Sequence, residues 1–435
     1  MRRRSGSVGR PAAPSGRERQ TEIYSAGVFG QRPRTPIAWD ALERRARRAM
    51  SRAAFAYVAG GAGRELTMAA NRAGLDEWQL VPRVLRDVST RTLQTQLLGR
   101  SLPAPILLGP VGVSAMAHRG ADVAAARACA ELGIPMVFSN QASASMEDCA
   151  AVMGDAPRWF QLYWSTIDEL VESFLHRAAG CGCAAIVVTL DTTMLGWRPR
   201  DLDLASLPFA RGWGLAQYTS DPVFMRLARE RAGDPAPAPA PRPTPAALRT
   251  LLDISRAHPG RTLDNLRSRV PRAAVELFLQ SYSRPSITWD DLPWLRARTE
   301  LPIILKGILH PDDARRALDA GMDGIVVSTH GGRQVDGSIG AGQALPAVAA
   351  AVAGRVPVLL DSGVRTGADV LKALALGADA VLVGRPWVYG LAVGGADGVR
   401  DVLRNLIAEL DLTLALTGCT SVTQARELTL HRRGD

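Results

Sequence analysis

The sequence predicts a closed (β/α)8 barrel of the TIM type, with a helical segment before it and one long loop after its fourth strand. After residue 100, short apolar stretches of strand length alternate with amphipathic stretches of helix length, as expected for repeated βα units. Eight such apolar stretches occur, and eight parallel βα units favour a closed barrel over an open sheet. We expect the strands at residues 105–111, 135–139, 159–163, 185–190, 303–305, 325–328, 358–361 and 380–383.

The segments before the barrel differ from it in composition. Residues 1–35 are rich in Arg, Pro, Gly and Ser, and we expect them to form a disordered or extended arm. Residues 36–59 have a helical apolar pattern that ends at the glycine-rich residues 60–63. Residues 36–435 are therefore predicted to form one barrel domain. Its helices are expected to include residues 121–132, 167–179, 312–320, 344–353, 367–376 and 398–410.

One connection breaks the regular spacing. Residues 192–301 separate the fourth predicted strand from the fifth, and they contain the Pro-Ala run of residues 234–243. Such a run is typical of an extended, weakly packed linker. Because long loops at the C-terminal ends of barrel strands often cover active sites, we expect residues 192–301 to form a mobile, lid-like region over the site.

Composition excludes several classes of protein. The chain carries a formal charge of +10, yet its basic residues are spread along the sequence without an aromatic-interleaved patch, so we expect no nucleic-acid partner. No apolar run is long enough to span a membrane, and no apolar stretch follows the initial arginines as in a secretory signal. The five cysteines are scattered without a Cys-x-x-Cys pair, so we predict no metal site and a cytoplasmic location.

The segment 324–334 carries the strongest indication of chemistry. An apolar strand ends there in a histidine, two glycines and an arginine, His330 to Arg333. A histidine can accept a proton near neutral pH, and an arginine fork fits a carboxylate or phosphate. Acid–base chemistry on a small anionic substrate is one interpretation; a satisfied histidine in a glycine-rich turn is the other.

Other predicted strand ends favour an anionic, flat ligand. Glycines and arginines after the last two strands, Gly363, Arg365, Gly384 and Arg385, are suited to a phosphate. Lys306 ends a buried strand, where it must face a ligand or pair with an acid such as Asp361. Ser139, Gln161 and Thr189 could hydrogen-bond a flat heterocycle. The chain has no Gly-x-Gly-x-x-Gly after a strand and no Gly-x-Ser-x-Gly, which disfavours a nicotinamide dinucleotide fold and a serine hydrolase.

Taken in order along the chain, these motifs resemble one known family. Residues 160–163, 190–192, 305–307, 328–334, 361–370, 373–378 and 384–386 are similar to motifs of the FMN-dependent α-hydroxy-acid oxidase and dehydrogenase family. The resemblance extends from about residue 21 to residue 428. Within the family, the chain is most similar to lactate 2-monooxygenase, on residues 57–61, 196–202, 218–224, 310–316 and the long fourth loop.

The resemblance implies roles for individual residues. The catalytic group would be His330 as base, Asp191 stabilising its imidazolium, Lys306 stabilising negative charge on the flavin, and Tyr163. Arg198 and Arg333 would hold the substrate carboxylate, assisted by Tyr57 and Tyr163. FMN would contact Pro110, Val111, Gly112, Ser139, Gln161, Thr189, Lys306, Ser328 and Asp361, with its phosphate near Gly363, Arg365, Gly384 and Arg385.

The implied reaction is oxidation of a lactate-like L-2-hydroxy acid, with O2 as electron acceptor and oxidative decarboxylation of the product. The resemblance also implies a homo-oligomer, a tetramer or octamer. Thr329 stands where the family usually has asparagine, and residues 140–141 lie in a segment that varies on the substrate side. Release of a keto acid from glycolate, mandelate or another hydroxy acid therefore stays an alternative, as does a phosphate-binding barrel without redox chemistry.

Overall fold

The predicted barrel is confirmed. A computed structural model describes residues 15–234 and 244–434 of the chain, and its central sheet is a closed barrel in the order β10-β11-β4-β5-β6-β7-β8-β9. Neighbouring strands pair in parallel throughout the barrel. The strands are β4 (Ile106–Leu108), β5 (Met136–Phe138), β6 (Arg158–Leu162), β7 (Ile186–Thr189), β8 (Ile303–Lys306), β9 (Gly324–Val327), β10 (Val358–Leu360) and β11 (Ala380–Val383). All eight lie within one or two residues of a predicted strand or inside it.

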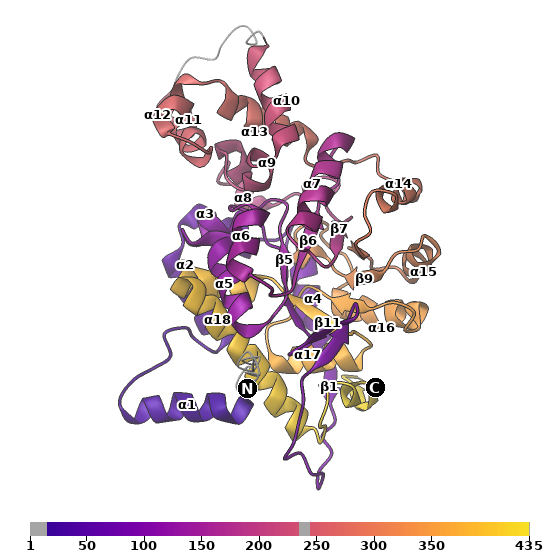
Figure 1. The fold of residues 1–435 in the computed structure, drawn as a ribbon. Helices are drawn as coiled ribbons and strands as arrows, with labels where there is room; N and C mark the ends of the chain where they lie inside the picture. Colours follow the sequence, from indigo (N-terminus) through magenta and orange to yellow (C-terminus); the bar gives the residue numbers. More distant parts are fainter. Residues whose placement is uncertain (1–14, 235–243, 435) are drawn as a thin grey trace, which may run out of the picture.

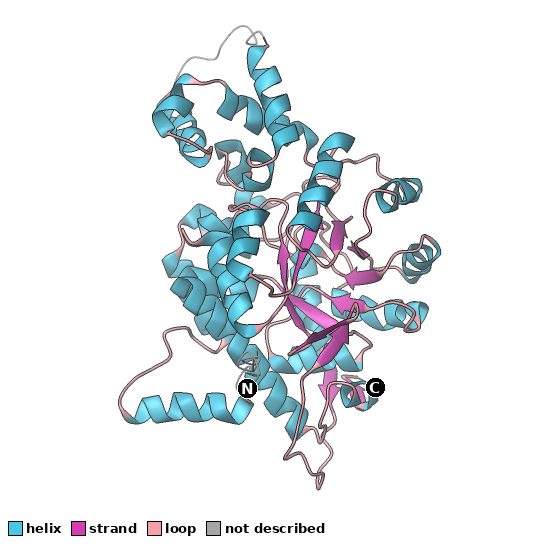
Figure 2. Cartoon of the chain, viewed as in Figure 1, coloured by secondary structure: helices cyan, strands magenta, loops and turns pink. Residues whose placement is uncertain are grey.

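Helices surround the barrel, as Figure 2 shows, because each carries an apolar face toward the strands. The surrounding helices are α5 (Ala121–Leu132), α6 (Met146–Met153), α7 (Asp168–Gly180), α14 (Leu292–Arg296), α15 (Pro311–Asp319), α16 (Ala341–Val352), α17 (Gly367–Ala375) and α18 (Arg385–Leu416). The predicted helix at residues 398–410 is the central part of the longer α18. Among the described residues, no helix is both long enough and apolar enough to cross a membrane.

Two short antiparallel pairs lie outside the barrel: β1 (Trp78–Leu80) with β12 (Leu430–Arg432), and β2 (Thr95–Leu97) with β3 (Arg100–Leu102). The hairpin β2–β3 turns through Leu98 and Gly99, both with positive φ, as a two-residue hairpin loop requires. Leu97 and Leu102 pack against the inward-facing layer of the barrel strands. This hairpin therefore covers one end of the barrel interior, and the functional groups gather at the other.

The N-terminal segment is more ordered than the sequence predicted. Residues 16–28, placed in an extended or disordered arm, form helix α1 (Gly16–Val28), which lies beside α18 in Figure 1. Ser15 and Glu18 make a reciprocal capping box at its start. Arg19 is buried and donates to Asn405 of α18 at 2.9 Å. These long-range contacts, which composition does not reveal, order the helix; residues 1–14 lie outside the described part.

The predicted helix over residues 36–59 is two helices, α2 (Trp39–Ala49) and α3 (Arg52–Ala59). The chain is extended at Met50, and the Ser51 side chain then caps α3 by accepting from the backbone N–H of Ala54 at 3.2 Å. Helix α4 (Leu66–Asp76) follows. It packs against α16 and against the turn after β9, which places it at the wall of the site.

The long connection between β7 and β8 is a small helical unit rather than a loop. It comprises α8 (Pro199–Leu202), α9 (Ala216–Thr219), α10 (Pro222–Gly233), α11 (Pro245–Ala257), α12 (Thr262–Arg267) and α13 (Val270–Ser281). In Figure 1 these helices gather at the top of the molecule. Phe209, Tyr218, Phe224 and Phe278 form their shared aromatic core. Most of the Pro-Ala run, residues 235–243, lies outside the described residues.

Asp221 anchors this unit to the barrel. The fully buried carboxylate accepts from Val223 N at 2.9 Å and so caps α10, and it pairs with Arg177 of α7 at 3.0 Å. Ser173 of α7 donates to it at 2.7 Å. One side chain thus joins α10 of the inserted unit to α7 of the barrel.

We predict that Asp221→Ala lowers the free energy of unfolding by about 3–5 kcal/mol, because it leaves the half-buried Arg177 without its inner partner and removes the cap of α10. Urea unfolding measured by circular dichroism checks this. Asp253→Ala, which breaks a 3.5 Å pair with the exposed Arg211 in the same unit, is the matched control and should change it by about 1 kcal/mol or less. Equal losses from the two variants would contradict the anchoring role.

Candidate active site

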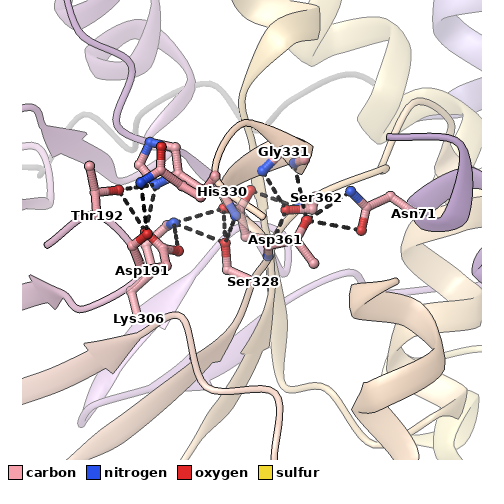
Figure 3. Close-up of polar contacts among 12 residues, drawn as sticks. Asn71, Asp191, Thr192, Lys306, Ser328, His330, Gly331, Asp361 and Ser362 are labelled. Atoms are coloured by element: carbon pink, nitrogen blue, oxygen red, sulfur yellow. Dashed lines mark hydrogen bonds and ion pairs between the residues drawn. The ribbon is translucent and has the colours of Figure 1, made fainter. Parts of the chain in front are cut away.

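The strand ends opposite the β2–β3 hairpin meet around one pocket. It is lined by all the site residues that the sequence predicted, except for two that lie behind the wall. These two are Asp191 and Ser328, which contact the lining residues His330 and Lys306. Figure 3 shows a continuous set of polar contacts that extends from Thr192 and Asp191, through Lys306, to Ser362. His330 lies in a glycine-rich turn and contacts Asp191 and Thr192, and it also lines the pocket, which favours the interpretation of acid–base chemistry.

His330 and Asp191 form a close pair. The Nδ1 atom of His330 lies 2.6 Å from Asp191 Oδ1, and Thr192 Oγ1 lies 3.1 Å from the same nitrogen. With a proton on Nδ1 donated to Asp191, the Nε2 atom is left to accept a proton from a ligand. Burial lowers the pKa of His330, and the Asp191 carboxylate opposes this shift only in part. The ring is therefore neutral near pH 7, as a base must be.

Lys306 is buried between two carboxylates. Its Nζ lies 3.2 Å from Asp191 Oδ2 and 3.2 Å from Asp361 Oδ2, and it donates to Ser328 Oγ at 2.9 Å. The predicted pairing with Asp361 is confirmed, and Asp191 is a second partner. Burial would lower the pKa of Lys306, but the two carboxylates raise it overall, so the ammonium stays charged.

Asp191 is shared by the base and the lysine. Burial alone would raise the pKa of Asp191, but the charges of Lys306 and His330 hold it well below its usual range. The carboxylate is therefore ionised whenever the protein is folded at ordinary pH. It can stabilise an imidazolium at His330 without itself taking the proton.

The buried Arg198 and the half-buried Arg333 contact each other in the same pocket. Arg198 donates from Nε to the carbonyl oxygen of Arg333 at 3.1 Å and from Nη2 to Gln334 Oε1 at 2.9 Å. Arg333 donates to the carbonyl oxygen of Gly60 at 2.8 Å, and its guanidinium lies 4.9 Å from the ring centre of Tyr57.

Neither arginine forms an ion pair with an acid of the described residues. Burial, and then the nearby charge of Arg198, lower the pKa of Arg333. Both facts mean that a bound anion would relieve an unfavourable concentration of positive charge. The pocket is therefore suited to a carboxylate at this point.

Two tyrosines complete this end of the pocket. Burial raises the pKa of Tyr57 and that of Tyr163, so both hydroxyls remain protonated and able to donate. The ring of Tyr163 lies 6.5 Å from that of His330. Phe209 of the inserted unit packs edge-on to Tyr57 at 6.4 Å, and Leu195 and Tyr282 also line the pocket. The sequence did not predict these last three, because nothing in their local pattern distinguishes them from core residues.

A second part of the pocket fits a polar ring. Gln161 Nε2 and Thr189 Oγ1 are buried without a hydrogen-bond partner among the described residues, and both residues line the pocket. Buried polar atoms are rarely left unpaired, so their partner is a ligand with acceptors and donors on its edge. Lys306 lies beside them at the end of β8, where its charge can stabilise an electron-rich ring. This arrangement fits the isoalloxazine ring of FMN.

The predicted phosphate residues divide into two groups. Arg365 stacks on Trp39 at 4.3 Å, and its guanidinium has no acceptor among the described residues. Gly363, beside it, has a φ of 91°, and a side chain there would meet the Asn71 carbonyl oxygen at 2.7 Å. Arg385 instead donates to backbone carbonyls, those of Val58, Gly60 and Gly331. Arg365 is thus the more available phosphate ligand.

Three further polar residues near the site were not assigned a role from the sequence. Asn71, on α4, contacts Thr329, and Ser362 accepts hydrogen bonds from the turn that carries His330. Thr192 contacts both His330 and Asp191. A buried asparagine within a helix gives no local signal, whereas Thr192 and Ser362 could have been suspected because they adjoin Asp191 and Asp361.

Comparison with known proteins agrees with this site. Residues 46–432 match the family described as FMN-dependent dehydrogenase. The chain is 42% identical over 414 residues to an FMN-dependent alpha-hydroxy acid dehydrogenase of Penicillium citrinum, covering 95% of each protein. It is 41% identical over 409 residues to an L-lactate oxidase of Lysinibacillus sphaericus, covering 94% of this chain and 96% of that protein.

Among solved structures, that of a mandelate oxidase aligns with a TM-score of 0.72 and 35% identity, covering 92% of this chain and 99% of the other. The predicted FMN cofactor and the predicted α-hydroxy-acid oxidoreductase class are therefore confirmed. The finer similarity to lactate 2-monooxygenase has no such support in these comparisons. The chain belongs to the FMN-dependent dehydrogenase family.

Proposed function

We propose that this enzyme oxidises a lactate-like L-2-hydroxy acid and passes the electrons to O2. The observation that carries the proposal is the meeting of a neutral base with two unpaired guanidinium groups in one pocket. Arg198 and Arg333 would bind the substrate carboxylate, while the hydroxyls of Tyr57 and Tyr163 orient it. The α-hydroxyl or the α-carbon proton then faces Nε2 of His330.

Each residue of the site has a separate role in the proposed reaction. His330 takes the proton at Nε2, and Asp191 stabilises the imidazolium that results. When bound, FMN supplies the acceptor for the two electrons that leave the α-carbon. Lys306 would place a positive charge beside the bound ring, and Gln161 and Thr189 would hold the edge of that ring. Arg365 and Gly363 would hold the phosphate of FMN.

We further propose that the keto acid stays bound until O2 has reacted. Phe209, Leu195 and Tyr282 of the inserted unit line the pocket, and this cover from the inserted unit supports retention of a small product between Arg198 and Arg333. Hydrogen peroxide formed beside it would oxidise the keto acid, so that lactate and O2 become acetate, CO2 and water. The L-lactate oxidase among the relatives favours a second outcome, in which pyruvate and hydrogen peroxide are released.

The proposed oxidation is tested by mixing the yellow holoenzyme anaerobically with a panel of L-2-hydroxy acids. We expect bleaching of the flavin absorbance, and a rate about 10²–10⁴ times lower in His330→Ala, because the base is lost. His176→Ala, at an exposed histidine on α7, is the control and should bleach at the normal rate. Equal rates for the two variants, or no bleaching with any hydroxy acid, would sink the proposal.

The pH dependence tests the role of His330 separately. Because burial lowers its pKa below the ordinary value of 6.5, kcat/KM should stay constant from about pH 8 down to 6.5 and fall only at lower pH. Asp191 raises this pKa, so Asp191→Asn should move the acidic limb to still lower pH while slowing the reaction. An acidic limb that lies above pH 6.5, or one that moves upward in Asp191→Asn, is inconsistent with this assignment.

Product analysis separates the two outcomes of the oxidation. With L-lactate and O2, retention predicts acetate and CO2 with little free peroxide. Phe209→Ala should shift the products toward pyruvate and hydrogen peroxide, because it opens the enclosure above Tyr57. Leu248→Ala, at an exposed leucine of α11, is the control. Pyruvate as the main product of the unmodified enzyme would rule out retention but leave the oxidation itself intact.

A further inference from the structure

The turn that carries His330 has an unusual backbone. His330, Gly331 and Gly332 are three successive residues with positive φ, of 55°, 65° and 74°. Histidine is not favoured in this region, since its side chain approaches the backbone too closely there. The turn therefore depends on hydrogen bonds from its backbone to side chains to keep His330 and Arg333 in place.

Side-chain hydroxyls provide these contacts. The backbone N–H of His330 donates to Ser328 Oγ at 3.0 Å, and that of Gly331 donates to Ser362 Oγ at 2.9 Å. The N–H of Thr329 also reaches Ser362 Oγ, at 3.3 Å, and the N–H of Gly332 reaches Thr329 Oγ1 at 3.2 Å. Three hydroxyl oxygens thus accept hydrogen bonds from four consecutive backbone N–H groups.

The Thr329 hydroxyl is itself held from a distant helix. Asn71 of α4 donates from Nδ2 to Thr329 Oγ1 at 2.8 Å, and both side chains are buried. The orientation of the amide is fixed as well, because Asn71 Oδ1 accepts from the backbone N–H of Ala341 at the start of α16 at 3.0 Å. The amide therefore joins α4, α16 and the turn of His330.

We propose that Asn71 and Thr329 are a positioning pair for the catalytic turn: the amide fixes the hydroxyl, and the hydroxyl fixes Gly332 between His330 and Arg333. This inference rests on the proposed function. Loss of the pair moves the base and one arm of the carboxylate clamp together, and a displacement near 1 Å slows catalysis about 10²-fold. If the pair only attached α4 to the barrel, its loss would lower the stability of the whole protein and would not specifically loosen the turn that carries His330.

The first test is hydrogen–deuterium exchange of the FMN-loaded enzyme without substrate, followed in peptides that cover residues 328–333. We expect faster exchange there in Thr329→Val and in Asn71→Ala, and normal exchange in Thr329→Ser, which keeps the hydroxyl. Thr417→Val is the matched control, because Thr417 is also buried and donates to Thr413 O at 2.9 Å at the C-terminal end of α18, away from the pocket.

The second test is the rate of anaerobic flavin bleaching at saturating hydroxy acid. Thr329→Val should slow it about 10- to 100-fold, while Thr329→Ser stays within about threefold and Thr417→Val is unchanged. The double variant Asn71→Ala/Thr329→Val should be no slower than its slower parent, because both changes remove one interaction.

Three results would overturn the proposal: exchange in residues 328–333 that is the same in Thr329→Val and Thr417→Val, a Thr329→Ser as slow as Thr329→Val, or single effects that multiply in the double variant. If Thr329→Val does not fold, Asn71→Ala compared with Thr329→Ser decides the question. The exchange test needs no substrate, so an enzyme that bleaches with no hydroxy acid would refute the proposed function without deciding this one.

Discussion

The site depends on one buried ammonium group placed between two carboxylates. Lys306 is 3.2 Å from an oxygen of Asp191 and 3.2 Å from an oxygen of Asp361, so the three groups carry a formal net charge of −1 at the base of the pocket. A proton on His330, which shares Asp191, would bring that charge close to zero. Burial keeps the His330 ring neutral before the reaction. The negative charge shared by Asp191 and Asp361 then stabilises the ring once it is protonated.

The positive charges of the pocket complete this balance. Arg198, Arg333 and Arg365 face the pocket without an acid of the described residues, so their charge has to be met by ligands. A substrate carboxylate and a cofactor phosphate are two anions that fit these positions. The same pocket can therefore bind both the substrate carboxylate and the cofactor phosphate through charge.

The sequence predicted the barrel and the lining of its mouth, because strands buried on both faces and glycine-rich strand ends leave local patterns. It did not predict what depends on contacts between distant segments. Helix α1 is ordered by α18, and the connection after β7 folds around aromatic residues such as Tyr218. Thr329 departs from the family pattern and so stands out in the sequence, but its partner Asn71 lies 258 residues away. No local pattern connects such a pair.

Lys306 and His330 share one charge network through Asp191. An NMR titration of His330 in histidine-labelled holoenzyme, compared with Lys306→Met, tests this most directly. The ammonium of Lys306 lowers the pKa of His330. Its removal should therefore raise that pKa, because Asp191 then interacts with the imidazole only. An unchanged or lower pKa of His330 in Lys306→Met would contradict the account.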